Sequence, residues 1–156
     1  MTKKLFIAFA VEDRTYRDFV SDQSKHRKTP VEFPNLEPKQ PWSPQWKTNC
    51  RTLVKGCEGM IALNSHHTPK AEGQLWEIQC AVDERVPLML MWVNGLRPQL
   101  PDLLKTKRIN IWNWDTLHSF VQCICAPPAH AGWMPARNSG VLASSHRALL
   151  PEPAEA

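Results

Sequence analysis

Short apolar runs alternate along the chain with longer segments whose apolar residues recur at helical spacing. Runs this short, without regular polar interruptions, are typical of strands that are covered on both faces of a parallel sheet. They predict strands at residues 5–11, 31–33, 59–64, 87–93 and 109–112. The intervening segments predict helices at residues 12–25, 43–57 and 115–125, and one that starts at Thr68-Pro69 and carries Glu77.

Strands that alternate with helices of this length favour right-handed crossovers and a parallel sheet with helices on both faces. We therefore predict an α/β, flavodoxin-like fold with five parallel strands in the order 2-1-3-4-5. Three prolines between residues 34 and 41 predict a long loop, and long loops in compact domains are often functional. Proline, alanine and serine dominate the last residues, so we predict a folded domain over residues 1–126 and a mobile tail over 127–156.

The helix that carries Glu77 is the most informative segment of the chain. Its predicted core-facing arc consists of Ala71, Leu75, Ile78 and Val82. Glu77 falls roughly 110° from the centre of that arc, at its margin, and Gly73 leaves room on nearly the same side for a ligand or a second backbone. Two interpretations follow: a helix-surface carboxylate beside a partly buried Trp76, or a catalytic carboxylate at the edge of a ligand site.

Composition fits one soluble domain with a real core, because the 156 residues are 42% hydrophobic and 22% charged. The formal net charge of +4 mildly favours anionic ligands such as dinucleotides, but the scattered basic residues disfavour nucleic-acid binding. Five cysteines without a CxxC pair indicate neither a disulfide framework nor a zinc site, and they favour a reducing cytosol. The apolar run at residues 5–11 is too short to span a membrane.

Several common site motifs are absent. The turn at residues 11–14 has no glycine for close approach to a pyrophosphate, so a Rossmann dinucleotide site is not indicated, and there is no P-loop. A phosphoacceptor receiver domain needs an aspartate where Asn64 stands. The adjacent His66 and His67 are a weak metal signal, and Ser65 lacks a nucleophile-elbow motif. We therefore predict no metal site.

Ligands of this architecture bind outside the carboxyl ends of the strands. The residues that we predict to line this edge and bind the ligand are Ala8, Phe9, Asp13, Phe33, Asn35, Asn64, His66 and Trp76. Glu77 is the candidate catalytic residue.

Three stretches resemble a known family. They are Leu5-Phe6-Ile7-Ala8-Phe9 with Asp13, the run 46–57 that enters Met60-Ile61-Ala62-Leu63, and the motif at 73–78 ahead of Val86-Pro87-Leu88. Together they resemble the bacterial TIR-like domains, the group that contains the TIR protein of Thoeris antiphage defence. The resemblance covers roughly residues 4 to 125, and Ala8 stands where many relatives carry serine.

The resemblance implies an enzyme that cleaves the nicotinamide–ribose bond of NAD, with Glu77 as the catalytic glutamate. NAD is then a substrate and no cofactor is needed. The product would be ADP-ribose or a cyclic isomer that signals to a separate effector. The resemblance also implies that the enzyme works in the bacterial cytoplasm and that self-association or contact with a phage-derived trigger protein activates it. Two alternatives remain open: a non-enzymatic TIR-like assembly module, and a nucleoside deoxyribosyltransferase-like enzyme, which also uses a glutamate at a ribose.

Overall fold

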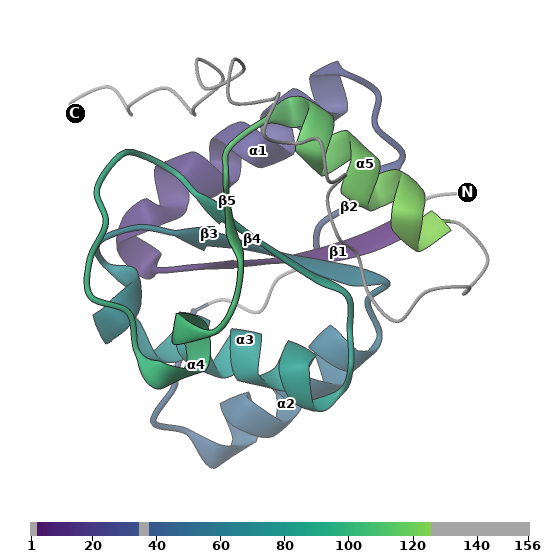
Figure 1. Cartoon of the computed structure of the whole chain (residues 1–156). Helices are drawn as coiled ribbons and strands as arrows, with labels where there is room; N and C mark the ends of the chain where they lie inside the picture. Colours follow the sequence, from purple (N-terminus) through teal and green to yellow (C-terminus); the bar gives the residue numbers. More distant parts are fainter. Residues whose placement is uncertain (1–2, 35–37, 126–156) are drawn as a thin grey trace.

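The computed structural model describes residues 3–34 and 38–125. Its sheet is parallel throughout, with the strand order β2-β1-β3-β4-β5 (Figure 1). The strands are β1 (Lys3–Phe9), β2 (Val31–Glu32), β3 (Gly59–Asn64), β4 (Leu88–Trp92) and β5 (Ile109–Ile111). This arrangement confirms the predicted flavodoxin-like fold. Asn35 and the predicted tail at 127–156 lie outside the described residues.

Helices cover both faces of the sheet. The helical elements are η1 (Val11–Asp13), α1 (Arg14–His26), α2 (Pro44–Lys55), η2 (Thr68–Lys70), α3 (Glu72–Asp83), α4 (Asp102–Lys105) and α5 (Trp114–Cys125). In Figure 1, α1 and α5 lie on one side of the sheet, and α2, α3 and α4 lie on the other. None of the helices among the described residues is both long and apolar enough to cross a membrane.

Strand periodicity divides the core into two layers. Successive side chains of a strand point to opposite faces. In β1, Leu5, Ile7 and Phe9 therefore pack under α1 and α5, whereas Phe6 and Ala8 pack under α2 and α3. Every residue of β3 is buried, which explains why this strand is a continuous apolar run rather than an alternating one.

Two helix predictions were wrong in detail. Thr68 does not start the long helix, because its hydroxyl accepts a hydrogen bond from the Ser65 amide and the segment closes into the short 3₁₀ turn η2. Helix α3 begins at Glu72 instead. The segment between β4 and β5, for which no helix was predicted, also contains the one-turn helix α4, which buries Leu104 against the sheet.

The buried side of α3 also differs from the predicted arc. Val82 is 36% exposed, whereas Gln74 and Glu77 are each 1% exposed. The helix packs against the sheet and against α2, so its buried surface is wider than one apolar stripe. Apolar periodicity did not predict the burial of Gln74 and Glu77, because it assigns polar residues to the solvent-exposed side of a helix.

Candidate active site

The carboxyl ends of the strands lie along one edge of the sheet, which we call the carboxyl edge. There the ends of β1 and β3 lie side by side, and Phe9 pairs with Leu63. The side-chain amide of Gln74 joins α3 to both strands. Its Nε2 donates to the Ala8 carbonyl at 3.0 Å and to the Leu63 carbonyl at 2.6 Å. Because Gln74 precedes Glu77 by nearly one helical turn, these bonds anchor the part of α3 that carries Glu77 to the strand ends.

Glu77 lies inside the protein. Its Oε1 accepts a hydrogen bond at 3.0 Å from Nζ of Lys39, whose side chain is 5% exposed. The same ammonium donates a hydrogen bond to the Phe9 carbonyl and lies 3.9 Å from the centroid of the Phe9 ring. The interpretation of Glu77 as a solvated helix-surface carboxylate was therefore wrong. Through Lys39, the structure brings Glu77 and Phe9 close to each other.

Gly73 makes room for a side chain of the same protein. A Cβ atom at Gly73 would lie 3.2 Å from Cδ of Lys39 and 3.8 Å from Cη2 of Trp46. A contact of 3.2 Å is tighter than side chains normally tolerate, so any larger residue would displace the lysine stem. The space that we predicted for a ligand or a second backbone is filled by Lys39.

A second polar cluster holds the loop after β3 against η1. Asp13 is 3% exposed and accepts a hydrogen bond from the Ser65 hydroxyl. That hydroxyl in turn accepts one from the His67 amide at 3.0 Å. Burial raises the pKa of the Asp13 carboxyl, and the Ser65 hydrogen bond together with nearby His67 and His66 offsets part of that rise. Asp13 thus links η1 to the loop that follows β3.

The raised pKa of Asp13 predicts a pH-dependent stability. A group with a raised folded-state pKa stabilises the fold at pH values below its unfolded-state pKa, and this stabilisation is lost as the pH rises through the folded-state pKa. We expect Asp13→Asn, which cannot ionise, to gain melting temperature relative to the unmodified protein as the pH is raised stepwise above about 4. Thermal unfolding across this range tests it, with Asp102→Asn at an exposed aspartate as the control. A difference that is the same at every pH contradicts the assignment.

Asn64 is fully buried at the end of β3. Its Nδ2 donates to the carbonyls of Ala62 at 3.2 Å and Met91 at 3.5 Å. Within the described residues, neither Oδ1 of Asn64 nor Oε1 of Gln74 has a hydrogen-bond donor. The carboxyl edge therefore contains two buried acceptor oxygens without donors among residues 3–34 and 38–125.

The other predicted binding residues are less closely grouped. Phe33 is half-buried against the core layer under α1 and α5, and His66 is exposed with its ring 4.0 Å from that of His67. Trp76 faces α2, because its indole N–H donates to the Lys47 carbonyl at 3.1 Å. The structure does not place Trp76 beside Phe9. In the part of the chain that is described, no group of three or more His, Cys, Asp or Glu side chains could hold a metal ion.

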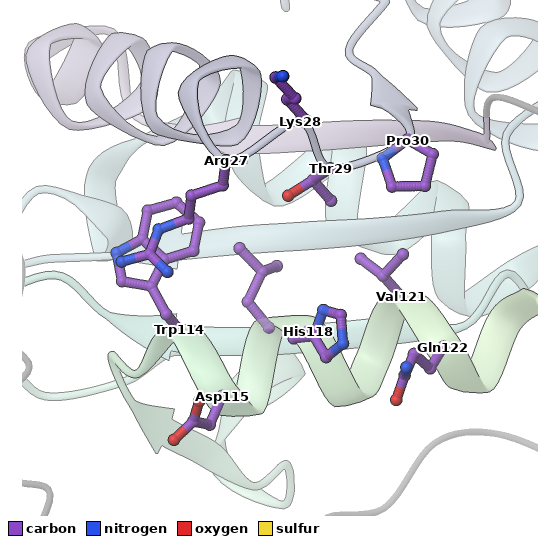
Figure 2. A pocket seen from close by; sticks show the side chains of 10 residues that line it. Arg27, Lys28, Thr29, Pro30, Trp114, Asp115, His118, Val121 and Gln122 are labelled. Carbon is purple, nitrogen blue, oxygen red and sulfur yellow. The ribbon is translucent and has the colours of Figure 1, made fainter.

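A hollow of about 680 Å³ lies elsewhere, between the turn that follows α1 and helix α5 (Figure 2). Its lining residues are Arg27, Lys28, Thr29, Pro30, Trp114, Asp115, Leu117, His118, Val121 and Gln122. The guanidinium of Arg27 stacks over the Trp114 ring at 4.7 Å. This hollow contains none of the predicted site residues, and Glu77 is on a helix of the opposite layer.

Sequence reasoning missed Lys39 and Gln74. Gln74 could have been found, since residues three apart on a helix share a side and Glu77 was already a candidate. Lys39 had no such signal. It lies between prolines in a loop, where side-chain direction has no periodicity to reveal it.

Comparison with known proteins supports the fold. No known family and no curated protein matches the sequence. Among solved structures, a prokaryotic SEFIR domain superimposes with a TM-score of 0.56 at 11% identity, over 87% of this chain and 99% of that chain. A 2-deoxyribosyltransferase from the psychrotolerant bacterium Bacillus psychrosaccharolyticus gives a TM-score of 0.49 at 17% identity, over 85% of this chain and 98% of that chain. At such identities, the SEFIR similarity concerns the TIR-like fold alone.

Proposed function

We propose that this protein is a TIR-like enzyme that cleaves the nicotinamide–ribose bond of NAD, with Glu77 as its catalytic residue. The observation that carries the proposal is the buried Glu77 carboxylate at the carboxyl edge, beside the ring and carbonyl of Phe9. The resemblance of the 73–78 motif to bacterial TIR-like domains supports the choice of NAD. Ligands bind at this edge in open α/β sheets.

The reaction needs little from the protein apart from charge stabilisation. Nicotinamide leaves as a neutral molecule from a cationic ring, so no general acid is required. Positive charge then develops on the ribose, and a nearby carboxylate stabilises it. The attraction is stronger inside the protein than in water because the surroundings of Glu77 are poorly solvated. Phe9 would stack on the ligand and exclude water, which favours cyclisation over hydrolysis.

The remaining predicted contacts complete the proposal. Ala8, Phe33, Asn64 and His66 lie at strand ends or in loops of this edge, and Asp13 lies in η1, which follows β1. These residues would hold the nucleotide, directly or by shaping the rim. The product, ADP-ribose or a cyclic isomer, would signal to a separate effector in bacterial antiphage defence.

We further propose that association with a second copy or a phage-derived trigger protein activates the enzyme in the bacterial cytoplasm. Trp42, which is 76% exposed at the end of the proline-rich loop, is an aromatic anchor of the kind enriched at interfaces.

The direct test is to incubate the purified full chain with NAD and, separately, with a deoxynucleoside plus a free base, and to identify the products by mass spectrometry. Release of nicotinamide with ADP-ribose or a cyclic isomer supports the proposal. Exchange of the base on the deoxynucleoside identifies a deoxyribosyltransferase instead. If neither substrate changes at any protein concentration, relative to mixtures without protein, and extract from phage-infected cells does not start the reaction, the result supports a non-enzymatic assembly module.

A further inference from the structure

The ammonium of Lys39 occupies a cage formed by three groups. Its Nζ is 3.0 Å from Glu77 Oε1 and 3.9 Å from the centroid of the Phe9 ring, and it donates to the Phe9 carbonyl. A carboxylate, the face of an aromatic ring and a carbonyl oxygen each attract positive charge. Together they form a cation-binding site, which we call the Glu77 cage.

Lys39 is buried far more deeply than its chain neighbours. Pro38 and Gln40 are exposed, whereas the Lys39 side chain is 5% exposed. Lysine is almost never fully buried unless its charge is paired. Its stem passes over Gly73, where the absence of a Cβ atom admits it. The side chain is therefore inserted into the cage and does not simply lie across its entrance.

The cage cannot hold Lys39 and a second cation together. The nicotinamide ring of NAD is positively charged, and so is the ribose in the transition state of the proposed reaction. Two like charges a few ångströms apart repel strongly where water is scarce. The Glu77 carboxylate, which hydrogen-bonds the Lys39 ammonium, is the group that the reaction needs.

We propose that Lys39 is an internal competitor of the substrate, and that the external ligands of the Glu77 cage are N-substituted pyridinium cations. This inference rests on the proposed function and adds the regulation of the same site. In the resting protein the cage is filled by the lysine. Substrate enters when the flexible stem of Lys39 swings its ammonium into water.

The test uses 1-methylnicotinamide, a permanent pyridinium cation that has no ribose and cannot be cleaved. Its binding to the full chain is measured by calorimetry for the unmodified protein, Lys39→Met and Lys39→Ala. Lys39→Met keeps an apolar stem over Gly73. It is therefore expected to fold even if Lys39→Ala, which loses that packing, does not. Lys47→Met is the matched control, because the Lys47 ammonium also lies over an aromatic ring, 5.2 Å from the Trp76 centroid.

We expect both Lys39 variants to bind the probe about tenfold more tightly than the unmodified protein and Lys47→Met. Adding Glu77→Gln to Lys39→Met should abolish the gain. Folded Lys39 variants that bind the probe no better than the unmodified protein overturn the proposal, as does a gain that survives Glu77→Gln. Tighter probe binding without NAD cleavage would retain the cage and refute only the proposed reaction. NAD cleavage together with unchanged probe binding would support the proposed reaction and refute the competition by Lys39.

Discussion

Glu77→Gln is expected to lower the rate of NAD cleavage by on the order of 100-fold or more while the domain stays folded. The amide keeps the size of the side chain and an oxygen that can accept from Lys39. It removes the negative charge that would stabilise the positively charged ribose in the transition state of the proposed reaction. The measurement is initial turnover of NAD, with circular dichroism to establish that the variant is folded.

Glu72→Gln is the matched control for this prediction. Glu72 is on the same helix but is exposed, so its charge lies in solvent and should have little influence on the reaction. Near wild-type turnover is expected for this variant. A folded Glu77→Gln protein that also retains near wild-type turnover would remove Glu77 from the mechanism.

Gln74→Leu is expected to destabilise the domain by about 2–4 kcal/mol, because two buried backbone carbonyls lose their side-chain donor. These are the carbonyls of Ala8 and Leu63, at the ends of β1 and β3. Leucine is similar in size to glutamine, so the loss reports on hydrogen bonds more than on packing. The melting temperature should fall by on the order of 10 °C.

Gln79→Leu provides the comparison for Gln74→Leu. Gln79 is on the same helix, and its Nε2 donates at 2.7 Å to Oδ1 of Asp83 in an exposed pair. Surface hydrogen bonds of this kind contribute little, so the melting temperature should change only slightly. Equal losses in the two variants would mean that the Gln74 amide does not hold the strand ends together.

Much of the fold was predictable from the sequence because buried parallel strands carry a local signal. The run from Gly59 to Asn64 is apolar at nearly every position, and it is buried on both faces in the structure. The start of α2 was also predictable, since the Ser43 hydroxyl accepts a hydrogen bond from the Trp46 amide next to a proline in the first turn. Signals of this type depend only on near neighbours in the chain.

The site was less predictable because its contacts join residues far apart in sequence. Glu77 could be singled out by its position beside Gly73, but in the structure it is paired with Lys39, which belongs to a loop 38 residues earlier. The Asp13–Ser65 contact spans 52 residues. The same limitation explains why the direction of the Trp76 side chain was not predicted. Its helix was predicted, but its indole N–H donates to a carbonyl of α2.

The role of Glu77 is tested by measuring nicotinamide release from NAD by four proteins side by side: the unmodified chain, Lys39→Met, Glu77→Gln and the double variant. We expect slow release by the unmodified chain and release about tenfold faster by Lys39→Met at low NAD concentration. Almost no release is expected from either protein that carries Glu77→Gln. Undiminished release from a folded Glu77→Gln protein would contradict the central claim that the buried carboxylate of Glu77 carries the chemistry.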